Sequence, residues 1–151
     1  MWLASLLGIG VLKAGFIPEK HIRQIRELVT LRKSYIKTLA DYKRRVHKLF
    51  ETANIKISSV VSNLFGNTGR NLINRLIDTD IEIKIEHVEE CAEGSLKRKV
   101  PELFRSIQGF FEAHHRFQLK MMMQTINHLE MENRLSILVM RILCQRARKK
   151  G

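Results

Sequence analysis

Hydrophobic positions recur at steps of three and four residues along the stretch from Pro18 to Ala53. No glycine or further proline interrupts this stretch, so it predicts one long amphipathic helix. Arg32 and Lys43 border the apolar stripe. A helix of about 35 residues is roughly 50 Å long, so we expect it to reach beyond one small core. The stripe consists of Ile25, Leu28, Leu31, Tyr35, Leu39, Tyr42, Val46, Leu49 and Ala53, and is widened by Val29, Ile36 and Phe50.

A second uninterrupted pattern runs from Ala113 to about Arg146. Its apolar residues fall into two seams, the second slightly rotated from the first. Such seams are typical of coiled coils. We expect this helix to cover the stripe of the first one, either as an antiparallel pair or as an intermolecular coiled pair. The first seam is Met122, Ile126 and Leu129, and the second is Leu135, Leu138 and Ile142.

Short helices separated by turns are predicted between the two long segments. Ser58 and Ser59 begin a short turn, and Thr68 caps a helix from Gly69 to Ile77. Leu96 to Val100 is a short basic turn. Pro101 suits the first position of a helix that runs to about Glu112.

Residues 81–86 are ambiguous, because they alternate strictly between apolar and charged side chains, which favours a strand. Val88 and Ala92 continue the apolar spacing at helical steps, Asp80 suits an N-cap, and no comparable second strand exists. We therefore expect a helix here and an all-α fold in three parts. Residues 1–17 form an apolar helix from Trp2 to Lys13 and a connector, residues 18–112 the long basic helix and the short helices, and residues 113–151 the C-terminal long helix and a basic tail.

The charge balance indicates a polyanionic partner. Lys and Arg total 27 against 15 Asp and Glu, a formal net charge of +12. Nucleic acid is favoured over an anionic membrane, and a solubilising basic surface is the alternative. The N-terminus lacks a basic region typical of a signal, and Lys13 interrupts it before a span is complete. The residues expected to contact nucleic acid are Arg23, Arg26, Lys33, Lys37, Arg44, Arg45, Lys48, Lys56, Arg70, Lys97, Arg98 and Lys99.

The segment Gly66-Asn67-Thr68-Gly69-Arg70 has two interpretations. Its backbone N–H groups at a helix start, its hydroxyl and its guanidinium together suit one phosphate. An ordinary capped turn explains the same residues equally well.

Catalytic patterns are sparse, and we predict neither a catalytic nor a metal site. Asp78 and Asp80 are expected to end one helix and cap the next. Glu112-x-x-His115 is half of a two-metal pattern, and His114 and His115 are expected to point in different directions. Ser58 has no base near it in sequence. Cys91 and Cys144 are far apart, which indicates free thiols in a reducing cytoplasm.

Several residue runs, taken together, match one protein family. They resemble the end of the RuvC-like domain and the helical region after it in transposases of the insertion sequence one-ten family, the DEDD-type recombinases guided by a bridge RNA. The resemblance covers nearly the whole chain to about residue 135. The runs are Trp2-Leu3-Ala4, Gly10-Val11-Leu12-Lys13, Phe16-Ile17-Pro18, Arg44-Arg45-Val46-His47-Lys48-Leu49, Ala53-Asn54-Ile55-Lys56-Ile57-Ser58-Ser59-Val60, Leu64-Phe65-Gly66, Leu96-Lys97-Arg98-Lys99 and His114-His115-Arg116-Phe117.

The resemblance implies DNA binding, DNA transposition and recombination for the intact protein, with DNA and structured guide RNA as partners and Mg²⁺ as cofactor. It implies a prokaryotic cytoplasmic protein, residues 1–17 as the end of the RuvC-like domain, and a coiled coil that assembles subunits. The family's four acidic metal ligands would precede Met1, and nothing after Leu135 resembles its Pro-Gly-Ile-Gly segment or serine nucleophile. No catalytic residue carries over.

We therefore expect a truncated transposase without activity or cofactor of its own. It would retain nucleic-acid binding and oligomerisation with itself or with the full-length transposase, and no membrane partner. The alternative is a structural helical protein that pairs with full-length transposase without binding nucleic acid.

Overall fold

A computed structural model of the chain describes residue 8, residues 17–78 and residues 83–148. Every regular element within these ranges is a helix, so the predicted all-α class is confirmed. The helix expected from Trp2 to Lys13 and the Asp80 cap lie outside the described residues. The elements are α2 (Lys20–Thr52), α3 (Ile57–Val60), α4 (Asn67–Asp78), α5 (Ile85–Cys91), the 3₁₀ helix η1 (Gly94–Lys99), α6 (Val100–Ile107) and α7 (Ala113–Arg148).

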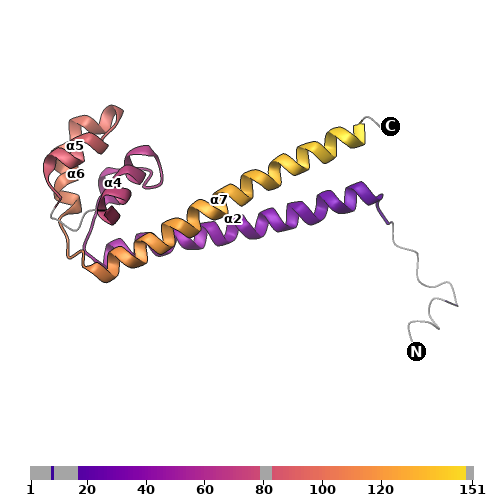
Figure 1. Cartoon of the computed structure of the whole chain (residues 1–151), viewed down its shortest axis with the longest axis horizontal. Coiled ribbons are helices and arrows are strands. Elements are labelled where there is room, and N and C mark those ends of the chain that lie inside the picture. The colour runs from indigo at the N-terminus through magenta and orange to yellow at the C-terminus, as the bar shows by residue number, and fades with distance from the viewer. Residues whose placement is uncertain (1–7, 9–16, 79–82, 149–151) are drawn as a thin grey trace.

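The two long helices, α2 and α7, lie side by side as an antiparallel hairpin (Figure 1). They contain 33 and 36 residues, so each is roughly 50 Å long at a rise of about 1.5 Å per residue. Of the two arrangements left open by the sequence, the antiparallel pair within one chain is found.

One seam of α7 follows the spacing of a coiled coil along its length. Its residues recur at alternating steps of four and three, and all are buried or half-buried. The predicted seam of Met122, Ile126 and Leu129 is thereby confirmed as part of a longer row. The row is His115, Leu119, Met122, Ile126, Leu129, Asn133, Ser136, Met140 and Leu143.

The second predicted seam of α7 is wrong. Leu135, Leu138 and Ile142 are 48%, 53% and 40% exposed. The seam continues instead through Asn133 and Ser136, which have the right geometry but polar side chains. In this part of α7 the hydrophobic residues therefore lie off the buried face, while the positions that helical geometry places on that face are polar.

The stripe of α2 departs from the prediction at two positions. Leu31 and Ile36 were expected to face inward but are 44% and 40% exposed. Arg32, expected only to border the stripe, is half-buried. Arg32 keeps the three- and four-residue spacing between Leu28 and Tyr35, so an arginine occupies a seam position.

The short helices form a head at the closed end of the hairpin, where α2 ends and α7 begins (Figure 1). There α3 packs on α6, α5 on α4 and α6, and α4 on α7. Because burying one large aliphatic side chain stabilises a fold by about 1.5–3 kcal/mol, this core is the main source of stability. Its largest fully buried members are Val46, Phe50, Ile57, Leu72, Ile73, Val88, Leu103, Leu119 and Ile126.

α2 ends at Thr52, close to the predicted end at Ala53, and Asn54 sets this end. Asn54 has a φ of 55°, and the N–H of Ile55 donates to the carbonyl of Phe50 at 2.8 Å. A left-handed residue after the last turn commonly ends a helix in this way.

The helix that begins near Pro101 is shorter than predicted, since α6 ends at Ile107 rather than Glu112. The chain leaves the helix to reach the end of α2, and the N–H of Phe110 donates to the carbonyl of Ala53 at 2.8 Å. A side chain on Gly109 would overlap that same carbonyl. The close approach requires glycine here and ends the helix.

Two predicted helix starts are also corrected. α5 begins at Ile85, and Ile83 and Lys84 precede it without regular structure. α4 begins at Asn67, so Thr68 lies inside the helix and does not cap it. The hydroxyl of Thr68 instead accepts a hydrogen bond from the N–H of Glu93 at 3.1 Å.

Candidate nucleic-acid interface

The basic residues predicted on α2 all lie exposed, and two of them, Arg45 and Lys48, also line a groove between α2 and α7. Because the apolar stripe is turned toward α7, the charges at the remaining positions face solvent. Tyr42 and Asp41 order part of this row: the Arg45 guanidinium lies 5.0 Å from the Tyr42 ring centre, and Arg44 pairs with Asp41. The row consists of Arg23, Arg26, Lys33, Lys37, Arg44, Arg45 and Lys48.

Four further predicted residues lie exposed in the head rather than along the hairpin. Lys97, Arg98 and Lys99 are consecutive in η1. Lys56 lines a cavity of about 330 Å³ together with His47 and Ser58. These residues therefore form separate basic positions and do not extend the α2 row.

Arg70 differs from the other predicted residues, because its guanidinium is engaged within the protein. It donates to the carbonyl of Phe65 at 3.0 Å, to Asn127 Oδ1 at 2.7 Å and to Glu130 Oε2 at 2.7 Å. Lys43 pairs with the other oxygen of Glu130 at 3.2 Å. This network joins α2, α4 and α7 at the point where the head meets the hairpin.

The geometry of the Gly66–Arg70 segment does not favour a phosphate site. The side-chain amide of Asn67 donates to Glu93 Oε2 at 3.3 Å, so a carboxylate already lies at the start of α4. Thr68 is bonded to the backbone of Glu93. A phosphate here would meet the charge of Glu93, and Arg70 points elsewhere.

A polar groove lies between α2 and α7 near the closed end of the hairpin. It has a volume of about 330 Å³, and its lining includes Arg45, Lys48 and Thr52 from α2 and His114, His115 and Gln118 from α7. Sequence reasoning found the two cations but not the α7 residues. The α7 residues could have been found from the expected antiparallel pairing, because that pairing brings the start of α7 beside the end of α2.

The prediction that the adjacent histidines His114 and His115 point in different directions is wrong. Their ring centres are 3.8 Å apart, and Phe111 stacks on His115 with ring centres 6.0 Å apart. His115 Nδ1 accepts a hydrogen bond from the N–H of Glu112 at 3.2 Å, and His114 Nδ1 lies 3.2 Å from Glu112 Oε2. Glu112 and His115 therefore form the N-terminal cap of α7, in the manner of a capping box.

His87 has the same role at the start of α5, where its Nδ1 accepts from the N–H of Lys84 at 3.4 Å. In residues 17–78 and 83–148, no group of three or more His, Cys, Asp or Glu side chains is placed to hold a metal ion.

The structure brings a base to Ser58 that the sequence did not indicate. His47 Nδ1 lies 3.0 Å from Ser58 Oγ. Glu51 lines the same cavity, but among the described residues no hydrogen bond joins its carboxylate to His47. The His47 ring instead meets Phe65 edge-on, with centres 5.8 Å apart. Nothing orients the imidazole as a nucleophile's base requires.

The two cysteines occupy different environments. Cys91 is buried in the head and Cys144 is exposed on α7. Burial raises the pKa of the Cys91 thiol, an effect partly offset by Arg75 and reinforced by Glu90.

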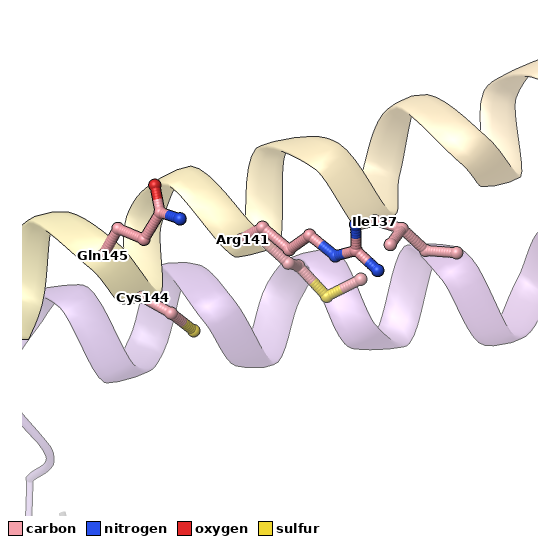
Figure 2. A pocket seen from close by; sticks show the side chains of 5 residues that line it. Ile137, Arg141, Cys144 and Gln145 are labelled. Atoms are coloured by element: carbon pink, nitrogen blue, oxygen red, sulfur yellow. The ribbon is translucent and has the colours of Figure 1, made fainter.

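The open end of the hairpin carries a hollow of about 340 Å³ whose lining side chains all belong to α7. Figure 2 shows Ile137, Arg141, Cys144 and Gln145 along it. None of the helices that the structure describes combines the length and the apolar content that crossing a membrane requires.

No family model, curated protein or solved structure matches the chain. The likeness to transposases therefore rests on the residue runs given above.

Proposed function

We propose that the chain is the helical, nucleic-acid-binding part of a transposase of the insertion sequence one-ten family. It binds the sugar-phosphate backbone of DNA and of structured RNA in the prokaryotic cytoplasm and performs no chemistry by itself. The observation that carries this proposal is the exposed basic row on α2.

The length of the row suits a duplex. Arg23 and Lys48 are the ends of the row, and at about 1.5 Å per residue they are roughly 38 Å apart along the axis. One turn of B-DNA is about 34–36 Å. Each phosphate neutralised releases counterions, so affinity must fall as salt rises.

The test is fluorescence anisotropy with duplex DNA and with a structured RNA across a salt series. A protein that makes about 6–10 phosphate contacts loses roughly 10³–10⁵ in affinity between about 50 and 200 mM salt. We expect a steep loss for both ligands. Lys33→Gln combined with Lys37→Gln should weaken both, whereas Lys84→Gln in the head should not. Affinity that does not change with salt would contradict the proposal.

A pairing function is the second candidate, favoured by an exposed apolar row on the open half of α7. Met131, Leu135, Leu138 and Ile142 are 52%, 48%, 53% and 40% exposed. Their steps of four, three and four residues are those of a coiled-coil seam. A two-fold axis brings such a row against itself, so the occupant we infer is a second copy of this hairpin, on an identical chain or on a full-length transposase.

Leu135→Lys combined with Leu138→Lys tests pairing by light scattering. Both side chains are exposed, so the hairpin should stay folded while a dimer becomes a monomer. A substitution at Val46 on α2 would not test pairing between chains, because Val46 is fully buried within the chain's own core. A parent protein that is monomeric at every concentration would exclude this candidate.

A further inference from the structure

The groove between the end of α2 and the start of α7 has the composition of an oxyanion site. Arg45 and Lys48 bring two positive charges to it from α2. No Asp or Glu is among its lining residues. The carboxylate of Glu112 is held at His114, and Glu51 lines the separate cavity beside His47 and Ser58.

His115 is among the residues that line this groove. The residue is 8% exposed, and its ring is held by Phe111 and His114. Its Nδ1 accepts from the N–H of Glu112 at 3.2 Å, so the neutral ring carries its proton on Nε2. The nitrogen left for a ligand is therefore a donor.

Two other features favour an anion at the same place. The side-chain amide of Gln118 offers donors from the next turn of α7. The groove also adjoins the first turn of a helix of 36 residues, whose N-terminal end carries a partial positive charge. These features add to the cationic pair and do not replace it.

We propose that this groove binds one phosphodiester of the nucleic-acid backbone. Arg45 and Lys48 neutralise the phosphate, and His115 Nε2–H and the Gln118 amide donate hydrogen bonds to its oxygens. The inference rests on the proposed nucleic-acid binding and gives that function a defined contact. Its volume of about 330 Å³ lies at the lower end of small-molecule sites, about 300–1,000 Å³, which suits a phosphate with its sugar.

The first experiment compares two pairs of charge-removing substitutions on the same helix. Arg45→Gln with Lys48→Gln removes the groove cations, and Lys33→Gln with Lys37→Gln removes the same charge outside the groove. All four side chains are exposed, and circular dichroism checks that both variants are folded. Because hydrogen bonds to charged groups are strong, the variant without the groove cations should lose about 10- to 100-fold in affinity for a short oligonucleotide duplex. The control pair should lose less.

The second experiment locates the ligand by NMR of the histidine rings. On titration with a short oligonucleotide duplex, and separately with inorganic phosphate, the His114 and His115 ring signals should shift. The signal of His128, exposed further along α7, should not. The shifts should disappear in Arg45→Gln with Lys48→Gln. Shifts with inorganic phosphate but not with the oligonucleotide would identify a site for free phosphate and overturn the proposal.

The outcomes separate the groove from the general function. If the parent binds with a steep salt dependence but both pairs of substitutions weaken binding equally, the groove is refuted and the basic row stands. If His115 does not shift while the oligonucleotide is bound, the groove is likewise refuted. If the parent shows no salt-dependent binding at all, the proposed function itself fails.

Discussion

The two halves of the α2–α7 hairpin share one helical geometry and differ in what fills their seam. Near the head, Val46 and Leu49 of α2 and Leu119 and Ile126 of α7 are buried. Toward the open end the seam positions include Arg32, Asn133 and Ser136. The open half thus keeps the regular spacing of seam positions but does not fill them with hydrophobic side chains.

The polar seam of the open half carries a cost. Arg32 Nε and Asn133 Oδ1 are buried without a hydrogen-bond partner among the described residues. An unsatisfied buried group costs about 1–3 kcal/mol. The closed half therefore supplies most of the stability, and the open half is expected to open locally at a lower free energy.

The largest difference between the halves is expected for leucine truncation. Leu119 is fully buried near the head, whereas Leu138 is 53% exposed in the open half. Leu119→Ala should lower the free energy of unfolding by about 2–5 kcal/mol, because it leaves a cavity. Leu138→Ala should change it by less than about 0.5 kcal/mol. Urea denaturation followed by circular dichroism measures both, and equal effects would contradict the comparison.

The next effect is expected at the junction of the halves. Glu130→Gln removes the negative charge that holds Arg70 and Lys43. The side chains of Glu130, Arg70 and Lys43 are 23%, 28% and 32% exposed. The cost should lie between those of surface and buried pairs, about 1–2 kcal/mol.

The control for Glu130→Gln is Glu90→Gln, which breaks the more exposed pair with Arg75. This substitution should cost less than about 1 kcal/mol. A larger loss for Glu90→Gln than for Glu130→Gln would show that the junction network does not join the head to the hairpin.

A smaller effect of opposite sign is expected in the open half. Asn133→Leu should raise the free energy of unfolding by about 1 kcal/mol, because it removes an unsatisfied oxygen and extends the apolar seam. Arg134→Leu places the same side chain at an exposed neighbouring position and should give no gain. Thermal unfolding compares the two, and a loss of stability for Asn133→Leu would mean that the asparagine has a role in the seam.

The smallest effect on stability is expected from thiol modification. Iodoacetamide should modify exposed Cys144 in the folded protein without changing its unfolding, while buried Cys91 reacts much more slowly. The thiolate is the reactive form, and the pKa of Cys91 is raised by burial, so its reaction needs higher pH. The folded state favours the neutral form of the Cys91 thiol. The contribution of this thiol to the free energy of unfolding is therefore present at neutral pH and is lost as pH rises through the raised pKa. Mass spectrometry of the alkylated peptides measures the order of reaction.

Several features followed from local sequence alone. The uninterrupted spacing from Pro18 to Ala53 and from Ala113 onward predicted α2 and α7, and Pro101 marked the start of α6. The basic residues of α2 were correctly expected to be exposed, since a helix with one apolar face leaves the opposite face in solvent. Local backbone preferences and helical periodicity suffice for such predictions.

Other features depended on contacts between distant residues. Leu135 and Leu138 were predicted inward because hydrophobicity alone was followed, whereas packing against α2 selected the row through Asn133 and Ser136. The contact of Gly109 with Ala53 ended α6 early, and Glu93 lies at the start of α4, where a phosphate was one of two interpretations. The groove of Arg45, Lys48 and His115 arises only when the antiparallel register brings residues far apart in the chain together, and no local pattern specifies that register.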